Sequence, residues 1–212
     1  MDSEDLLIPS QVGNYRLESK IGRGSSSIVW KGIADKSSIP VAIKIIPKIW
    51  LDSELKLNKF RRELYLLQQM DHPFIVQFYQ MIEDDKFYYL VLEYVQNGSL
   101  RDYVENKGPL PEGLARRIYV QMYVALKYLH QEKLIVHRDI KAENILLDSG
   151  NNIRIIDFGL GNQFSVDQPE LNTLCGSMCM FLLGHLWPDF SNTNTRLYPP
   201  RNDKRGFLYF SS

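Results

Sequence analysis

The segment Ile135-Val136-His137-Arg138-Asp139-Ile140-Lys141-Ala142-Glu143-Asn144 is followed, thirteen positions after its last residue, by Asp157-Phe158-Gly159. Between the two lie short apolar runs, residues 145–147 and 153–156, joined by residues 148–152. The joining residues are Asp, Ser, Gly and Asn, which favour turns, so the sequence predicts a β-hairpin here. The charged and amide side chains that flank this hairpin in the sequence are the first candidates for chemistry.

The chain before this segment is predicted to be helical from about residue 99. Residues 99–102 resemble a capping box, Gly108 is a typical helix stop, and Pro111 opens a second helix. That second helix has an apolar stripe at spacings i, i+4, i+7 and i+11, which predicts one buried face. The stripe consists of Ile118, Met122, Ala125 and Leu129. Turn formers cluster at residues 96–98, where we place the boundary with the first half of the chain.

The first half is predicted to be rich in β-structure. Short β-branched or aromatic runs, punctuated by glycine and proline, occupy residues 15–18, 27–30, 41–46 and 87–92. One helix interrupts them between Ser53 and Met70, with Leu57, Phe60, Leu64 and Leu67 at spacings of three and four. Glu63 lies on the same side of this helix, where a desolvated carboxylate needs a partner. The whole pattern predicts the α+β class.

Two features of the first half are candidates for phosphate binding and charge pairing. Gly22 and Gly24 would let backbone amides approach phosphate oxygens, although the same glycines also suit an ordinary turn between strands. Lys44 lies inside an apolar strand, where an unpaired ammonium is costly, and Glu63 would supply the missing partner. The alternative for Lys44 is an edge strand from which the ammonium reaches water.

Composition narrows the function classes without selecting one. The chain has 212 residues, a formal net charge of zero and 44% hydrophobic residues, which predicts a globular fold and gives no sign of a nucleic-acid or basic membrane-binding surface. Only two cysteines are present, which suits a reducing compartment. The acidic N-terminus does not resemble a signal peptide, and residues 178–187 are too short for a membrane span. We expect a cytoplasmic or nuclear location.

Taken in order, the motifs resemble the eukaryotic protein kinase family. These motifs are the Gly-rich loop, Val41-Ala42-Ile43-Lys44, His-Arg-Asp with Asn144 five residues after Asp139, and Asp-Phe-Gly. Asp139-x-Lys141-x-x-Asn144 resembles the serine/threonine type, and residues 157–162 and 171–177 resemble the calcium/calmodulin-dependent and AMP-activated kinase group. The resemblance extends over residues 15–177. It implies a two-lobed fold with a complete β-rich N-lobe and an incomplete helical C-lobe.

The resemblance divides the chain into four parts. Residues 1–14 form an N-terminal extension, residues 15–96 the N-lobe, residues 97–177 a partial C-lobe, and residues 178–212 an atypical tail. The partial C-lobe would contain the hinge side, the catalytic loop, the Asp-Phe-Gly triplet and the start of the activation loop.

The resemblance also implies ATP and Mg²⁺ as cofactors and assigns a role to particular residues. Asp139 would accept the proton of the substrate hydroxyl, and Lys141 would neutralise charge on the transferred phosphoryl group. Lys44 would hold phosphate oxygens and be oriented by Glu63. The magnesium ligands would be Asn144 and Asp157. The nucleotide would contact Ile21, Gly22, Gly24, Val29, Ala42, Lys44, Glu93, Val95 and Leu146, with Leu92 at the gatekeeper position.

A protein carrying a Ser or Thr hydroxyl is the implied substrate, and an upstream activating kinase is a second implied partner. By resemblance, Thr173 is a candidate phosphosite in the activation loop, and a phosphate there would pair with arginines, Arg138 among them. The alternative for Thr173 is a threonine in a loop without this role. The sequence predicts neither the oligomeric state nor the identity of the substrate.

The chain also departs from the family. Ser27, Ala142 and Met178 replace a glycine and two prolines, and none of these changes removes a reacting group. Residues 178–212 contain no Ala-Pro-Glu motif and suggest out-of-frame or alternatively spliced sequence, or else a genuine short tail. We therefore expect truncation to impair transfer and to leave apolar surface open along the Ile118 stripe. The alternative function is a non-catalytic ATP-binding pseudokinase or interaction module.

Overall fold

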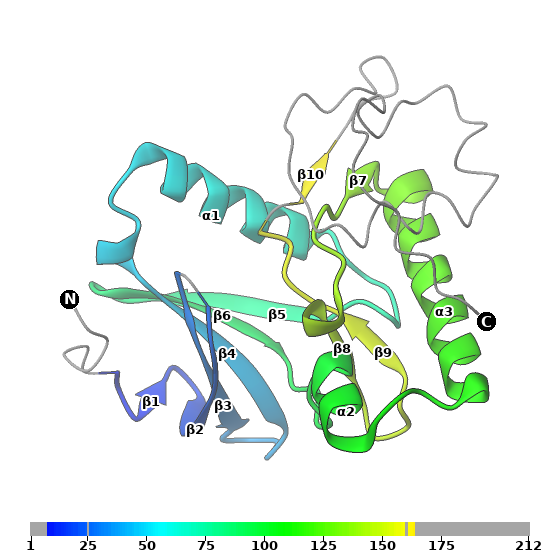
Figure 1. Ribbon diagram of the computed structural model, residues 1–212. Coiled ribbons are helices and arrows are strands. Elements are labelled where there is room, and N and C mark those ends of the chain that lie inside the picture. The colour runs from blue at the N-terminus through cyan, green and yellow to red at the C-terminus, as the bar shows by residue number, and fades with distance from the viewer. Residues whose placement is uncertain (1–7, 25, 160, 164–212) are drawn as a thin grey trace.

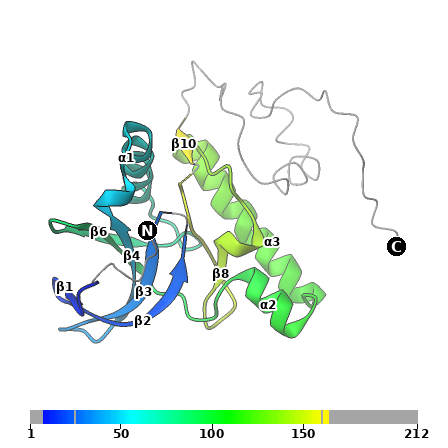
Figure 2. The same ribbon diagram turned by 60° about the vertical axis from the view of Figure 1, so that its left-hand side comes forward.

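The computed structural model describes residues 8–24, 26–159 and 161–163. A six-stranded antiparallel sheet with helix α1 lies on one side of the molecule, and helices α2 and α3 with a small β-hairpin lie on the other (Figure 1). The turned view separates the same two groups of elements (Figure 2). This is the two-lobed α+β fold that the resemblance implies.

The N-lobe is built on the sheet in the order β1-β2-β3-β4-β6-β5. Its elements are β1 (Gln11–Val12), β2 (Tyr15–Arg23), β3 (Ile28–Ala34), β4 (Pro40–Pro47), a 3₁₀ turn (Lys48–Trp50), α1 (Glu54–Gln68), β5 (Phe78–Glu83) and β6 (Phe87–Glu93). The sequence predicts four of these strands and the helix but not β1 or β5. Because β1 pairs with β2, two residues of the predicted N-terminal extension join the sheet. The division of the chain into four parts stays a prediction.

Both faces of the central strands β4 and β6 are covered. Val41, Ile43 and Ile45 lie in an outer cluster with residues of β1 and β6, whereas Ile46 and Leu90 lie in the main core. Burial on both faces explains why β4 is a nearly continuous apolar run rather than an alternating one. It also excludes the edge-strand interpretation of Lys44, since β4 lies between β3 and β6.

Helix α1 packs its predicted apolar side against the sheet. Ser53 caps its N-terminus by accepting a hydrogen bond from the backbone N–H of Lys56. Phe60 and Leu67 are buried, and the Phe60 ring stacks on Tyr88 of β6 with centroids 4.6 Å apart. The helix is therefore held in one orientation against the sheet, and this orientation fixes where the polar residues between its apolar positions point.

The C-lobe elements follow the predicted order. They are α2 (Leu100–Lys107), α3 (Glu112–Lys127), a π-helical turn (Tyr128–Glu132), β7 (Ile135–Val136), a 3₁₀ turn (Ala142–Asn144), β8 (Ile145–Leu147), β9 (Ile153–Ile155) and β10 (Asn162–Gln163). The capping box is confirmed, because Ser99 and Asp102 each bind the other's backbone N–H. Gly108 ends α2 at a φ of 82°. No helix among the described residues is long and apolar enough to cross a membrane.

The apolar stripe of α3 faces the main core. Ile118, Ala125 and Leu129 are buried there, so the expectation of open apolar surface along this stripe is wrong. The exposed apolar side chains of α3 are instead those of Tyr119, Val120 and Val124. Two residues along an α-helix correspond to about 200° of rotation, so Val120 lies on the far side from Ile118.

The two lobes join through the segment that follows α1. The backbone N–H of Val76 donates to the carbonyl of Ile155 at 3.0 Å, and the N–H of Ile155 donates to the carbonyl of Phe74 at 2.9 Å. Nearby, the Tyr128 hydroxyl accepts a hydrogen bond from the backbone N–H of Asp71 at 3.1 Å. These hydrogen bonds attach the β8–β9 hairpin to the segment that follows α1, and so to the N-lobe.

The π-helical turn contains a histidine, His130, whose pKa is shifted. Burial, helped by the nearby His137, lowers the pKa of His130 from 6.5 to about 4. Burial likewise lowers the pKa of His137. Between pH 6.5 and pH 4 the unfolded chain therefore binds protons that the folded chain does not, and folding becomes less favourable as the pH falls through this window.

We predict that the free energy of unfolding falls by about 2 kcal/mol between pH 7 and pH 5 because of His130 alone. The measurement is urea denaturation at a series of pH values for the wild type and for His130→Gln. The variant should show a shallower decline below pH 6.5. An identical pH dependence in both proteins would contradict a lowered pKa at His130.

Candidate active site

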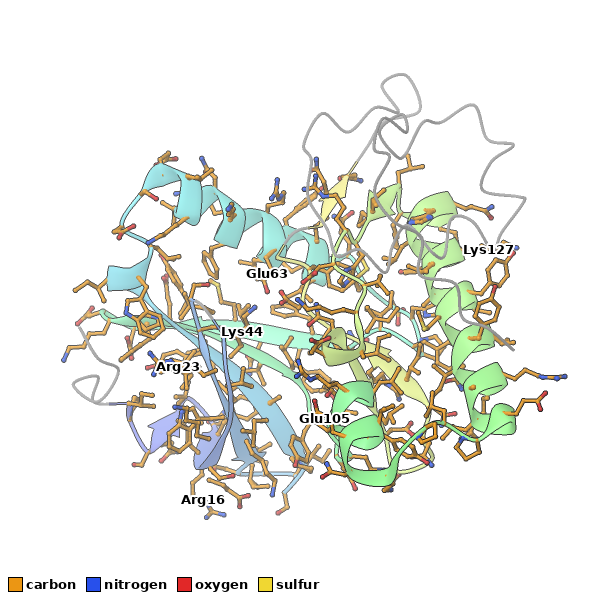
Figure 3. All side chains as sticks on the ribbon, viewed as in Figure 1. Arg16, Arg23, Lys44, Glu63, Glu105 and Lys127 are labelled. Carbon is orange, nitrogen blue, oxygen red and sulfur yellow. The ribbon has the colours of Figure 1, made fainter. Side chains whose placement is uncertain are left out.

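The first polar contact of the site crosses from the sheet to the helix. The Lys44 ammonium on β4 forms an ion pair with the Glu63 carboxylate on α1, and Figure 3 shows the two side chains between these elements. Only 17% of the Lys44 side chain and 13% of the Glu63 side chain are exposed. The predicted pairing is confirmed, and it removes the cost of leaving either charge unpaired in a partly buried site.

Electrostatics keep the Lys44 ammonium charged. Burial lowers its pKa, but the charges of Glu63 and Asp157 and the hydrogen bond to Glu63 raise it by more, so the pKa of Lys44 lies above its usual value. A permanent cation is therefore held on the inner side of the sheet, facing the start of the Asp157-Phe158-Gly159 segment.

The second polar contact centres on the carboxylate of Asp139. Its Oδ2 accepts a hydrogen bond from Lys141 Nζ at 2.8 Å and another from Asn144 Nδ2 at 2.9 Å. Asn144 Nδ2 also donates to the Asp139 backbone carbonyl at 2.9 Å. Both hydrogen bonds are donated by Asn144 Nδ2, so the amide oxygen of Asn144 takes part in neither of them. The turn at residues 139–144 thus brings together the Asp139 carboxylate, the Lys141 ammonium and the Asn144 amide.

His137 holds this turn from behind. Its Nε2 donates to the carbonyl of Ile156 at 3.0 Å, and its Nδ1 accepts from the backbone N–H of Asp139 at 3.2 Å. The two contacts require the neutral tautomer with the proton on Nε2, in agreement with the lowered pKa of His137. His137 is fully buried and packs against Phe158, with ring centroids 4.7 Å apart and ring planes tilted by 59°. It positions the Asp139 backbone and presents no group to a substrate.

Asp157 and Asn144 lie at the same end of the hairpin. β8 and β9 are antiparallel, with Ile145 opposite Ile155, and the backbone N–H of Ile156 donates to the Asn144 carbonyl at 2.9 Å. Asp157 is exposed and adopts a φ of 66°, a conformation that non-glycine residues seldom take. Such strain at an exposed carboxylate is typical of a functional position.

The oxygen donors of Asp157 and Asn144 fit a magnesium ion in chemical type. Mg²⁺ is usually held by one or two protein carboxylates together with substrate phosphates and water, rather than by a cage of protein ligands. Among the described residues there is no cluster of three or more His, Cys, Asp or Glu side chains suited to a metal. The assignment of Asp157 and Asn144 as magnesium ligands stays a prediction.

The predicted nucleotide residues are distributed over neighbouring strands. In the sheet register Val29 lies opposite Lys44, and Ala42 lies opposite Leu92. The pairing of β2 with β3 shifts between Lys20 and Gly22, so Ile21 is a bulged residue. Val95 is buried, and Leu146 lies on β8 opposite Arg154. Their contacts with a nucleotide stay a prediction.

The Gly-rich turn is closed by a backbone hydrogen bond. The Gly24 N–H donates to the Ser27 carbonyl at 2.8 Å, although Ser27 replaces a glycine of the family pattern.

The hinge residue Glu93 is bound to the β8–β9 hairpin. Its carboxylate accepts two hydrogen bonds from Arg154 Nε, at 2.9 and 3.1 Å. The sequence reasoning missed Arg154. Arg154 lies between two isoleucines in residues 153–156, and this pattern predicts that its side chain points away from the core. The pattern does not predict that its partner is Glu93.

Two expectations lie outside the described residues. Thr173, the candidate phosphosite, and the tail at residues 178–212 are both in this category. Arg138, by contrast, is described: it is buried next to His137 and has a φ of 65°. A role for Arg138 toward a phosphate stays a prediction, as does any impairment caused by the tail.

The geometry agrees with comparisons to known proteins. A sequence profile of the family described as Protein kinase domain matches residues 15–180. This chain belongs to the protein kinase domain family. The match begins at the first residue of β2 and includes every residue of the two polar contacts.

Among curated relatives, the serine/threonine-protein kinase SIK1 of Mus musculus is 41% identical to this chain over 169 residues. SIK1 of Rattus norvegicus is 40% identical over the same length. Each alignment covers 80% of this chain and 21% of the relative. The protein kinase domain of this chain thus corresponds to about a fifth of either relative, and the activity of the rest is not carried over.

We predict that Lys44→Met lowers the free energy of unfolding by about 1–3 kcal/mol, because Glu63 then keeps a partly buried carboxylate without its partner. The double variant with Glu63→Gln should recover part of this loss. Chemical denaturation of the two variants and the wild type measures both effects. Equal stability of the single variant and the wild type would show that the ion pair does not hold α1 against the sheet.

Proposed function

We propose that this protein kinase domain is of the serine/threonine type and transfers the γ-phosphoryl group of ATP to a hydroxyl group of a protein. The observation that carries this proposal is the Asp139 carboxylate held by Lys141 and Asn144. It is supported by the neighbouring Asp157 and by the resemblance to SIK1 from two mammals.

The reaction requires a proton acceptor next to the attacking hydroxyl. The hydroxyl oxygen forms a bond to the γ-phosphorus while the bond between that phosphorus and the β–γ bridging oxygen breaks, and the electron pair leaves with ADP. The hydroxyl proton passes to the Asp139 carboxylate, which is oriented by the two hydrogen bonds that it accepts. The first product is a phosphorylated side chain, and the proton is later released to solvent.

Lys141 has two tasks in this scheme. Its hydrogen bond to Asp139 raises its pKa, so it stays cationic at neutral pH. The Lys141 side chain is 35% exposed, and its ammonium would approach an oxygen of the phosphoryl group during transfer, when negative charge is spread over the equatorial oxygens. The same ammonium therefore orients the base and stabilises the charge that the base helps to move.

The nucleotide would lie between the sheet and the β8–β9 hairpin. Lys44 would bind phosphate oxygens, with Glu63 keeping its ammonium in place, and the backbone amides at Gly22 and Gly24 would cover the phosphates. Asp157 and Asn144 would hold Mg²⁺, which supplies charge neutralisation for the β- and γ-phosphates when it is bound. The hinge residues Glu93 to Val95 would bind adenine through their backbone.

The polar groups favour catalysis over the non-catalytic alternative. A module that only binds nucleotide has no need of a carboxylate with the hydrogen bonds that Asp139 makes, nor of a lysine directed at it. An upstream kinase acting at Thr173 belongs to the proposal as well, on the resemblance of residues 171–177 to an activation loop.

We predict that Asp139→Asn lowers the rate of phosphate transfer roughly 10²–10⁴-fold, because the amide cannot accept the proton. Binding of Mg·ATP should be retained, since Asp139 is not among the phosphate or metal ligands. Transfer from radiolabelled ATP to a generic Ser/Thr peptide and the ATP-dependent rise in melting temperature measure the two properties. Undiminished transfer by the variant would contradict the assignment of Asp139 as the base.

A further inference from the structure

The strand that leads into the Gly-rich turn carries a bulge at an acidic residue. β2 pairs with β3 so that Leu17 lies opposite Gly32 and Ser19 lies opposite Lys31. Glu18 is therefore left out of the pairing. A bulge redirects the side chain of the extra residue and often occurs next to an active site. In this chain the redirected side chain belongs to Glu18.

The redirected carboxylate meets a lysine from the neighbouring strand. Lys31 Nζ lies 2.8 Å from Glu18 Oε2, and the two side chains are 30% and 34% exposed. The same Nζ lies over the ring of Tyr94, 5.6 Å from its centroid. Distances of this order are within the range of cation–π attraction. Lys31 thus contacts the Gly-rich hairpin and the hinge at the same time.

The register places Lys31 on the nucleotide side of the sheet. It lies opposite Ala42 in β4, just as Val29 lies opposite Lys44, and residues directly opposite in a sheet point to the same face. Val29, Ala42 and Lys44 are the residues proposed above to contact the nucleotide. Lys31 continues this row towards the hinge.

The hinge is the fixed side of this contact. Glu93 is bound to Arg154 and its backbone N–H donates to the Gln77 carbonyl at 2.9 Å, while the Asn97 N–H donates to the Leu147 carbonyl at 3.0 Å. The end of β2 near Gly22 has a single partner strand, β3, among the described residues. The Gly22 end of β2 is therefore connected to the rest of the sheet through β3 alone, which pairs in turn with β4.

We propose that Glu18, Lys31 and Tyr94 form a clasp that sets the angle between the Gly-rich hairpin and the hinge, and that Lys31 is a positioning residue for the nucleotide phosphates. The proposal rests on the function proposed above. Glu18 and Gly24 are six residues apart, about 20 Å along a strand, so a tilt of about 6° at the clasp would move the turn by about 2 Å. A displacement of this size is enough to remove backbone hydrogen bonds to a phosphate.

The test compares Mg·ATP with adenosine as ligands of Lys31→Met. Adenosine relies on the hinge, which keeps its own contacts, whereas Mg·ATP also relies on the hairpin. We expect the Kd for Mg·ATP, measured by calorimetry, to rise about three- to tenfold, a change that corresponds to the loss of two weak contacts. The Kd for adenosine should change less than twofold. In phosphate transfer, KM for ATP should rise while KM for the peptide stays constant.

Three further variants separate positioning from a general loss of charge or stability. Lys31→Arg keeps the cation and should restore Mg·ATP binding, and Glu18→Gln should reproduce part of the loss. Lys56→Met is the matched control, because Lys56 forms a comparable ion pair with Asp52 at 2.9 Å at the start of α1, outside the clasp. It should bind both ligands like the wild type. If Lys31→Met does not fold, Glu18→Gln serves as the test variant.

The outcomes are distinguishable from a failure of the proposed function. A wild type that binds no Mg·ATP overturns the proposed function and the clasp together. Normal Mg·ATP binding by the wild type and an unchanged Kd in Lys31→Met overturn the clasp alone. An equal loss for adenosine and Mg·ATP, or a loss shared with Lys56→Met, also overturns it, because neither result would come from the angle of the hairpin.

Discussion

The ion pair between Lys44 and Glu63 is the contact on which the arrangement of this kinase domain depends. A lysine in the centre of a sheet buried on both faces cannot direct its ammonium into water, so it needs a carboxylate from another element. Helix α1 supplies that carboxylate only in the orientation set by Phe60 and Leu67. Apolar packing and charge pairing thus require the same position of helix α1, so together they allow fewer orientations of the helix than either would alone.

The requirement that a buried charge has a partner also determines the structure of the loop between β7 and β8. Asp139 is largely buried, and its carboxylate is stabilised by hydrogen bonds from Lys141 and Asn144. The neutral imidazole of His137 holds the backbone of this loop in place. These groups come from one stretch of eight residues, so the loop assembles most of its polar contacts locally. The β8–β9 hairpin then brings Asp157 alongside without a long connection. The Lys44 pair joins the sheet to helix α1 within the N-lobe, whereas this network lies within the C-lobe.

Sequence reasoning succeeded where one physical requirement fixed the answer. An unpaired Glu63 on an apolar helix side required a cation, and Ser99 with Asp102 completed a cap, so both could be predicted. The strand β1 was missed because two residues carry no periodicity, and β5 because most of its side chains are exposed at the edge of the sheet. The bulge at Glu18 and the partner of Glu93 depend on register and on distant strands, which a single sequence does not encode locally.

The outer cluster beneath β1 gives the position of Lys44 a second dependence. Ile43 and Ile45 flank this lysine in the chain and are packed on the face opposite to the site, so the depth of the strand is set by side chains that touch neither nucleotide nor metal. A change of one methyl group in that cluster would move the ammonium relative to Asp157. Substitutions in the outer cluster can therefore change the position of the Lys44 ammonium in small steps. Related domains that differ in these apolar residues would then differ in function, although the residues touch no ligand.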